Sequence, residues 1–444
     1  MKAKLLLFFY ALTIVLFILG CKDKTVPVAT NATTASSSIN TNHLDHLYVP
    51  VIFPNGTKAA GIYIYAEAPN YDLIGDSDEG FTCVDDVSRA ALFYLRSDNF
   101  SSDSIIKNKA ISLLQFVLQM QAANGYFYNF LLPGDIINTT HQTSRAEPNW
   151  WSWRALQTLT EAVPVIKGSD SALSRKIDAA INKLLRNVKS HLGRLPLKTK
   201  SVNGITVPQW LPAGSASDQA AILLLALINH CSQNNDAELE KYIRKLADGI
   251  VMMQTERTNG FPFSCILSWE NVWHAYGCDQ AFALMKASAF LKDSTYLIKA
   301  LAEVNNFYPW LLSNGMKSSF KVERNGNEFA ILDAKDFEQI AYGIRPMIFA
   351  ATEAYDVTKD KKYADIAGQL GSWFFGKNAA NFIMYDKYTG RGFDGIIGVG
   401  KVNKNSGAES TIEALLSLQR LENYPVIKPG FLGGAQTEKT ILNQ

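Results

Sequence analysis

The sequence has few cysteines, almost no net charge and none of the short motifs that bind common cofactors. Its five cysteines include no CxxC pair and no Cys/His cluster, which argues against a structural zinc site. A formal net charge of +2 gives no reason to expect nucleic acid as a partner. His-Glu-x-x-His, a phosphate loop and a dinucleotide fingerprint are also absent. We therefore expect no cofactor and no metal site.

Two stretches bear on cation binding and cross-linking. The acidic run Asp76-Ser77-Asp78-Glu79 lacks the spacing of an EF-hand loop, so we interpret it as a solvated loop. Cys265 and Cys278 are close together in the sequence. The sequence leaves open whether these two form a disulfide in an oxidising compartment.

The N-terminus has the pattern of a bacterial secretory signal. Lys2 and Lys4 precede an apolar run, Leu5 to Leu19, which is shorter than the roughly 20 residues that a membrane-spanning helix needs. The run ends at Gly20-Cys21 and resembles a lipobox, which implies cleavage before Cys21 and lipidation of Cys21. A plain export signal is the alternative. We expect a lipid-anchored protein of the bacterial cell envelope, periplasmic or on the outer surface.

Composition and periodicity divide the chain into four segments. Residues 1–20 are the signal peptide, and residues 21–45, rich in Thr, Ala, Ser and Asn, are a flexible tether. Residues 46–425 form the folded domain, which begins with a small strand-containing lead-in. Residues 426–444 are a C-terminal tail. We expect this protein to be a monomer.

From Cys83 onward the apolar residues recur with a helical period. Helices are expected over residues 83–97, 103–122, 148–166, 170–190, 215–233, 236–254, 271–291, 294–313, 336–356, 360–377 and 407–421. They come in pairs whose first members start about 56 to 71 residues apart, which indicates stacked units. Six such starts predict an all-α (α/α)6 toroid, two concentric rings of helices. The last pair is incomplete, and the lead-in is expected to close the ring.

Two adjacent carboxylates stand at the beginning of the first predicted inner helix. One aspartate there would be explained as a helix cap, but Asp85 and Asp86 together leave one carboxylate that capping does not use. Arg89 follows on the next turn. The pair is therefore either a cap with a salt bridge or a catalytic or sugar-binding pair.

The other inner-helix starts also combine acids with aromatic side chains. Because these starts meet at one end of a toroid, they would line one cleft, where carboxylates bind hydroxyl groups and indoles stack on sugar rings. Capping alone explains the acids but not the tryptophans. The residues that we expect to bind a carbohydrate are Arg89, Glu147, Asn149, Trp150, Trp151, Trp153, Asp218, Glu270, Trp273, His274, Arg345 and Arg391.

Glu409, at the start of the last inner helix, is the best partner for Asp85 and Asp86. The first and last inner helices are neighbours where a ring closes, so these carboxylates would face one cleft. A glutamate in an indole-lined cleft has a raised pKa and can act as an acid, while an aspartate beside Arg89 stays ionised. A favourable interaction of Glu409 with the helix dipole is the alternative.

These residues resemble the six-hairpin glycosidase superfamily over most of the chain, from about Tyr65 to Leu421. The stretch Cys83-Val84-Asp85-Asp86-Val87-Ser88-Arg89-Ala90 is similar to a segment that recurs in bacterial six-hairpin proteins. Trp373-Phe374-Phe375-Gly376-Lys377-Asn378 and Asn405-Ser406-Gly407-Ala408-Glu409 resemble the end of family 9 glycoside hydrolases. The resemblance implies that Asp85 and Asp86 hold a water molecule, that Glu409 is the acid, and that the product is inverted.

The sequence departs from family 9 in two places. Family 9 spaces its aspartates three residues apart, and its Pro-His-His-Arg segment is replaced here by Tyr388-Thr389-Gly390-Arg391-Gly392-Phe393. We therefore predict a glycoside hydrolase acting on an oligo- or polysaccharide through two carboxylates. A glycan-binding surface lipoprotein without catalysis is one alternative. A polysaccharide lyase or epimerase is another, with His274, His141, Tyr276 and Arg345 available for proton abstraction.

Overall fold

The computed structural model describes residues 37–427 of the chain. The predicted signal peptide, Cys21, most of the predicted tether and almost all of the C-terminal tail lie outside these residues. Within residues 37–427, no helix is both long enough and apolar enough to cross a membrane.

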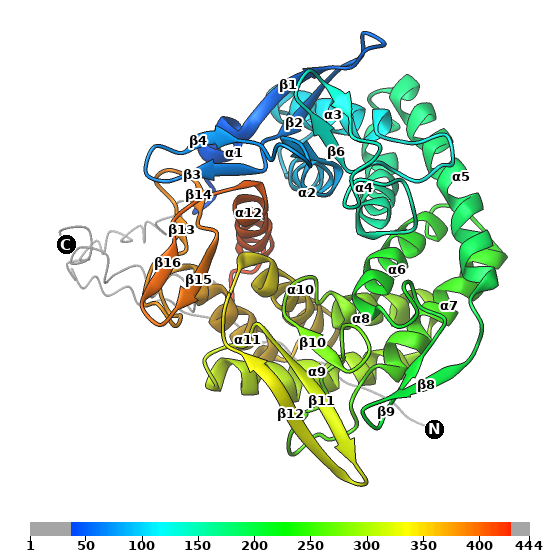
Figure 1. Cartoon of the computed structure of the whole chain (residues 1–444), viewed down its shortest axis with the longest axis vertical. Helices are drawn as coiled ribbons and strands as arrows, with labels where there is room; N and C mark the ends of the chain where they lie inside the picture. Colours follow the sequence, from blue (N-terminus) through cyan, green and yellow to red (C-terminus); the bar gives the residue numbers. More distant parts are fainter. Residues whose placement is uncertain (1–36, 428–444) are drawn as a thin grey trace, which may run out of the picture. The chain divides into compact units, whose positions relative to one another are not determined.

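Six helices form an inner ring in which each packs on the next, and the last packs on the first. Figure 1 views this ring along its axis, with the inner helices seen nearly end on. The inner helices are α2 (Val84–Leu95), α4 (Trp150–Ile166), α6 (Ser217–Cys231), α8 (Gln280–Leu291), α10 (Ala341–Thr358) and α12 (Ala408–Glu422). The predicted (α/α)6 toroid is confirmed by this closed ring.

Five further helices form the outer ring, and each packs on the inner helix that precedes it in the chain (Figure 1). They are α3 (Ser104–Gln119), α5 (Ser171–Arg194), α7 (Ala237–Met252), α9 (Ser294–Ser313) and α11 (Lys361–Gly371), the last followed by the 3-10 helix η1 (Ser372–Phe374). The two rings bury their apolar faces against each other, and burial of this surface is the main stabilising contribution.

The two rings begin their helices in different ways. Every outer helix starts with an aspartate whose side chain accepts a backbone N–H of the first turn: Asp103, Asp170, Asp236, Asp293 and Asp360. No inner helix has an aspartate as its N-cap with such a bond. Cys83 and Asn149 cap α2 and α4, and α6, α8, α10 and α12 have no side-chain cap.

Small antiparallel strand pairs connect the helices and extend from the mouth of the ring. The strands after α2 are β6 (Phe130–Leu132), β7 (Ile136–Ile137), β8 (Thr199–Val202), β9 (Ile205–Pro208), β10 (Val272–His274), β11 (Ser319–Asn325), β12 (Glu328–Lys335), β13 (Tyr385–Asp386), β14 (Arg391–Gly392), β15 (Gly395–Gly398) and β16 (Lys401–Asn403). The long β11–β12 hairpin is the most prominent of them in Figure 1.

The lead-in closes the ring, as predicted. It contains α1 (Asn42–Leu47), β1 (Tyr48–Ile52), β2 (Lys58–Ile62), β3 (Tyr65–Glu67), β4 (Asp72–Ile74) and β5 (Thr82–Cys83). The α1 helix packs on α12, and β2 packs on α2 and α3. The backbone N–H groups of Ser406 and Ala408 donate to the carbonyls of Ala66 and Ile64, both at 3.0 Å, and so join the lead-in to the start of α12.

The predicted boundaries differ most from the structure in two places. Residues 42–45, assigned to the tether, belong to α1, because His43 and Leu44 are buried against the body of the domain. Residues 271–279, predicted as the start of an inner helix, contain β10 instead, and α8 begins only at Gln280. A strand forms there because Val272, Trp273 and His274 pair with β11.

Candidate active site

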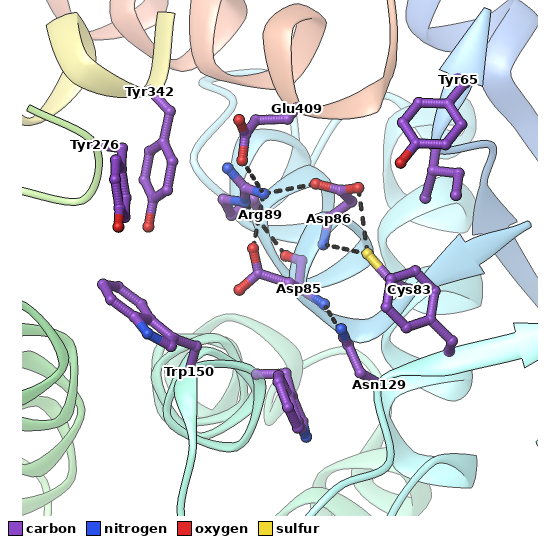
Figure 2. A pocket seen from close by; sticks show the side chains of 13 residues that line it. Tyr65, Cys83, Asp85, Asp86, Arg89, Asn129, Trp150, Tyr276, Tyr342 and Glu409 are labelled. Atoms are coloured by element: carbon purple, nitrogen blue, oxygen red, sulfur yellow. Dashed lines mark hydrogen bonds and ion pairs between the residues drawn. The ribbon is translucent and has the colours of Figure 1, made fainter. Parts of the chain in front are cut away.

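The N-terminal ends of four inner helices surround a pocket of about 440 Å³ at one mouth of the ring. Its charged side chains come from α2 and α12, and its aromatic side chains come mainly from α4, α10 and the segment before α8 (Figure 2). The lining residues are Ile64, Tyr65, Cys83, Asp85, Asp86, Arg89, Asn129, Phe130, Trp150, Trp151, Tyr276, Tyr342 and Glu409.

Arg89 brings the three predicted catalytic carboxylates together. Its Nη2 lies 2.7 Å from Asp85 Oδ2, 2.6 Å from Asp86 Oδ1 and 3.2 Å from Glu409 Oε2. Figure 2 shows the three acids converging on this guanidinium group. The first and last inner helices therefore meet at one charged centre, at the position where the ring closes.

Asp85 and Asp86 do not cap α2. The cap is Cys83, whose Sγ accepts the backbone N–H of Asp86 at 3.4 Å and whose thiol donates to Asp86 Oδ2 at 3.2 Å. The backbone N–H of Asp85 donates to Asn129 Oδ1 at 3.2 Å. Neither aspartate side chain therefore caps the helix, and both belong to the lining of the pocket.

A second layer of buried charges fixes Arg89 from below. Glu413, fully buried one turn after Glu409 on α12, accepts from Arg89 Nη1 at 2.8 Å and from Arg345 Nε at 2.6 Å. Arg345 in turn donates to both carboxylate oxygens of Asp279, at 2.6 and 3.1 Å. Because each guanidinium and each carboxylate group in this series of buried contacts has a partner, the position of Arg89 is tightly determined.

Arg154 supports Asp85 from the neighbouring helix α4. Its Nε lies 3.3 Å from Asp85 Oδ1, and its Nη2 donates to the hydroxyl of Tyr342. The guanidinium groups of Arg89 and Arg154 both lie over the Tyr342 ring, at 4.8 and 5.5 Å from its centroid. These contacts hold Tyr342 as part of the pocket wall.

The surroundings separate the pKa values of the carboxylates. Loss of hydration raises the pKa of Glu409 to about 7; Arg89 opposes this shift, whereas Asp86, Glu413 and Asp85 add to it. Burial alone would raise the pKa of Asp85, but Arg89 and Arg154 outweigh burial and lower it. Burial also raises the pKa of Asp86 against the pull of Arg89. At neutral pH the pocket thus holds one ionised aspartate and one glutamate that is partly protonated.

The protein atoms around Glu409 and Asp85 remove part of their hydration, but both side chains still open to the pocket more than that of Asp86. The Glu409 side chain is 43% exposed and that of Asp85 is 21% exposed, whereas that of Asp86 is 9% exposed. Because Asp85 Oδ2 and Glu409 Oε2 contact the same nitrogen at 2.7 and 3.2 Å, they lie no more than about 6 Å apart. Inverting glycosidases separate their carboxyl groups by about 6.5–9.5 Å, and retaining enzymes by about 5–5.5 Å.

Aromatic side chains form the wall opposite the acids. Figure 2 shows Trp150, Tyr276 and Tyr342 on this side of the pocket. Gly277 lies between them with φ +64°, and a Cβ atom there would be 2.9 Å from the Tyr342 hydroxyl and 3.1 Å from Trp150. This close approach requires glycine, and it keeps the three rings near one another.

His274 and Asp218 lie behind this wall and do not line the pocket. His274 stacks on Tyr276 with ring centroids 3.7 Å apart, and its Nε2 is 3.0 Å from Asp218 Oδ2. His274 Nδ1 is 2.9 Å from the carbonyl oxygen of Tyr276. The pair therefore supports Tyr276 from behind. His141 also lies outside the lining, beside Thr143.

Several residues predicted to bind substrate lie elsewhere in the domain. Trp153 and Trp273 are buried in the core, packed against other rings, and Arg345 is buried in the ion network. Asn149 accepts the backbone N–H of Trp150 as a helix cap.

Glu147, Glu270 and Arg391 are also absent from the pocket lining. Glu147 is exposed, Glu270 is paired with Lys200, and the Arg391 guanidinium group lies 3.7 Å from the centroid of the Tyr71 ring. Of the predicted residues, the structure brings Asp85, Asp86, Arg89, Trp150, Trp151 and Glu409 together in one pocket.

Glu413 and Arg154 were missed as functional candidates from the sequence. Each follows a pocket residue by four positions on the same helix, Glu413 after Glu409 and Arg154 after Trp150. Residues four apart lie on one helix face, so this spacing was the available signal. Tyr342 had no comparable signal, because it lies in the first turn of α10, which starts later than predicted.

The fold and the pocket define an (α/α)6 toroid with an acidic and aromatic site at one mouth. No protein-family model matches the chain, and no curated protein matches it. Among solved structures, the chain is similar to a cellobiose 2-epimerase from Bacillus thermoamylovorans B4167, with a TM-score of 0.56, 12% sequence identity and coverage of 82% of this chain and 92% of that one.

Two further solved structures extend the comparison. The chain is similar to a D-mannose isomerase, with a TM-score of 0.56, 13% identity and coverage of 86% of this chain and 96% of that one. A family 9 endoglucanase, J30, matches with a TM-score of 0.49, 13% identity and coverage of 86% and 83%. The likeness to the epimerase and the isomerase shows that the chain has the fold of these two proteins, an (α/α)6 toroid.

Proposed function

We propose that this protein is a carbohydrate-active enzyme, a glycoside hydrolase that cleaves an oligo- or polysaccharide with Glu409 and Asp85. The observation that carries the proposal is the opposite pKa shift of two accessible carboxylates in one aromatic pocket. Glycoside hydrolysis requires one carboxyl group that gives a proton and one that stays ionised.

In the proposed reaction Glu409 protonates the oxygen of the leaving sugar while the Asp85 carboxylate attacks the anomeric carbon. The glycosidic bond breaks and a glycosyl ester forms on Asp85. Glu409, now ionised, then takes a proton from water, which hydrolyses the ester and restores both groups. Arg89 and Arg154 hold Asp85 in its charged form.

This scheme replaces the inversion predicted from the sequence with retention. The scheme is drawn with direct attack because Asp85 Oδ2 and Glu409 Oε2 share Arg89 Nη2 and so lie within about 6 Å of each other, and the product NMR described below decides between retention and inversion. Asp86, which is less exposed and has a raised pKa, is assigned to positioning Arg89 and not to attack.

The aromatic wall supports a sugar as the substrate. The rings of Trp150 and Tyr276 present flat faces on which the C–H side of a pyranose can stack, while the hydroxyl groups meet the acids. Burial raises the pKa of both Tyr276 and Tyr342, which makes these phenols poor bases for a lyase or epimerase. Neither His274 nor His141 lines the pocket.

We also propose that the enzyme is a monomer anchored in the bacterial cell envelope by lipidation of Cys21, a residue outside the described part of the chain. Acylation would place the toroid next to the membrane without a spanning segment. Mass spectrometry of the purified protein tests this proposal: acyl groups on an N-terminal Cys21 support it, and an intact or unacylated N-terminus contradicts it.

The test of the function is a product-release assay of the full-length protein against a panel of neutral and uronate-containing glycans. New reducing ends without an unsaturated product support hydrolysis. An absorbing unsaturated product would replace the proposal with a lyase, and binding without any product would replace it with a glycan-binding lipoprotein. Proton NMR of the first product distinguishes retention from inversion.

A further inference from the structure

A second cavity, of about 360 Å³, lies at the opposite end of the ring from the candidate active site, and five inner helices and the residue that follows α2 line it. Arg96, directly after α2, and Arg420, in the last turn of α12, belong to its lining. The first turns of these same two helices carry Asp85 and Glu409. The two cavities are therefore reached from opposite mouths of the toroid.

Buried ion pairs separate the two cavities. Arg89, Glu413 and Arg345 form a continuous chain of contacts of 2.6 to 2.8 Å beneath the active site. The Arg345 guanidinium group lies 5.2 Å from the centroid of the Phe349 ring, and Phe349 lines the second cavity. A ligand in the second cavity would therefore touch none of the proposed catalytic residues.

The charged residues of the second cavity already have partners. Arg96 lies 2.9 Å from Glu161, and Lys286 lies 2.7 Å from Glu353. Arg420 is 3.1 Å from Glu353. A charged ligand would have to break one of these pairs, so the cavity favours a neutral ligand.

Two carboxamide groups in the lining are unpaired. The Gln157 side chain belongs to a residue that is only 7% exposed, and it makes no hydrogen bond to any residue within 37–427. Asn229, at the end of α6, likewise has no side-chain hydrogen bond among the described residues. Neither amide is among the buried side-chain groups without a partner, so both are open to the cavity, where they can donate and accept hydrogen bonds. Hydroxyl groups of a ligand match this requirement.

Phe282 and Phe349 form part of the apolar lining of the second cavity. Phe282 and Phe349 lie with their ring centroids 5.6 Å apart and their planes at 79°. The Lys286 ammonium group lies over the Phe282 ring, and the guanidinium groups of Arg96, Arg345 and Arg420 lie over the Phe349 ring. A ligand would therefore meet the edges of both rings, with its hydroxyl groups at the two carboxamides.

We propose that the second cavity is a binding site for a neutral mono- or disaccharide, separate from the active site. The inference goes beyond hydrolysis and does not depend on it. Its ligand would donate to and accept from Gln157 and Asn229 and place its C–H groups against the edges of Phe282 and Phe349. The completed ion pairs of Arg96, Lys286 and Arg420 would exclude uronates.

The test is calorimetric titration of the full-length protein with glucose, galactose, mannose, xylose, cellobiose and glucuronate. The Trp150→Ala variant removes a stacking surface of the active site, and the Gln157→Met variant removes the amide while keeping the side-chain volume. We expect a neutral sugar to bind Trp150→Ala as tightly as the wild type, and Gln157→Met at least about fivefold more weakly. Glucuronate should not bind.

Controls keep the result interpretable. Gln142 is exposed and outside both cavities, so Gln142→Met should bind like the wild type. Asn229→Ala is a second, independent variant in case Gln157→Met lowers the melting temperature. The proposal is overturned if no neutral sugar binds the Trp150→Ala variant. It is also overturned if the double variants, in which Gln157→Met or Asn229→Ala is added to Trp150→Ala, bind the sugar as tightly as Trp150→Ala alone. If the protein binds a neutral sugar in the second cavity but turns over no glycan, the proposed hydrolysis is contradicted and the second binding site is not.

Discussion

Glu409 Oε2 and Arg89 Nη2 lie 3.2 Å apart, across the junction between the last and the first inner helix. This contact joins the two ends of the folded domain at the site where we place the chemistry. Because Glu413 on α12 also binds Arg89, the closure of the ring and the formation of the site depend on the same side chains.

The first prediction concerns the pH dependence of activity. The pKa of Glu409 is raised to about 7, and a general acid works only in its protonated form. We therefore expect kcat/KM to fall as the pH rises through about 7, well above the ordinary range of a glutamate. The measurement is a pH profile of kcat/KM. A decline centred at about pH 4.3, the ordinary pKa of a glutamate side chain, would show that Glu409 is not the acid.

The second prediction concerns the buried charge layer. Glu413→Gln would leave Arg89 and Arg345 with one fewer carboxylate in a fully buried position. We expect a loss of roughly 3–5 kcal/mol in the free energy of unfolding, measured in urea. Asp365→Asn, which breaks only the exposed contact with Lys361, should change stability by less than about 1 kcal/mol. If Glu413→Gln and Asp365→Asn lowered the free energy of unfolding by the same amount, the stabilising role of the buried Glu413 carboxylate would be contradicted.

The third prediction concerns the contact between the lead-in and α12. A Cβ atom at Gly407 would lie 2.4 Å from the carbonyl oxygen of Ile64, which is backbone and cannot move aside easily. Gly407→Ala should therefore shift the start of α12, displace Glu409 and lower both the melting temperature and kcat. Gly168→Ala, where nothing lies within 4 Å, is the matched control. Unchanged kcat in Gly407→Ala would count against this view of ring closure.

The fourth prediction concerns Glu303, which is buried in α9 and accepts the backbone N–H of Ile266 at 2.7 Å. Burial raises the pKa of Glu303 to about 8, so the folded state keeps its proton where the unfolded chain loses it. This group's contribution to stability is complete below the unfolded pKa, and it decreases as the pH rises through about 8.

The Glu303→Gln variant keeps a side-chain oxygen that can accept the backbone N–H of Ile266, but its amide does not titrate. We expect the stability of the wild type relative to Glu303→Gln to decrease between about pH 5 and pH 9, as measured by urea unfolding at both values. A difference between the two proteins that stays constant over this interval would refute the assignment.

Helical periodicity was sufficient to predict the toroid, because each inner helix carries a nearly continuous apolar pattern. It failed at residues 271–279, where Trp273 is buried by strand pairing with β11 and not by helix packing. That pairing joins segments far apart in the sequence, so no local pattern indicated it.

The acids of the site were predictable because they begin inner helices without capping them, whereas the aspartates of the outer helices do cap. Trp153 was assigned to the pocket with Trp150, but it lies almost one turn deeper along α4, where its indole packs against Tyr126 and donates to Gln219 Oε1. The distance between Asp85 and Glu409 depends on how Arg89 packs between two helices, which the sequence does not specify.

The central claim is tested most directly by Glu409→Gln, measured for turnover and for substrate binding on the same glycan. The account predicts that kcat falls by about 10²–10⁴ while the dissociation constant changes little, with Glu147→Gln, exposed in the segment before α4, behaving like the wild type. Full turnover in Glu409→Gln would contradict the account and remove Glu409 from the chemistry.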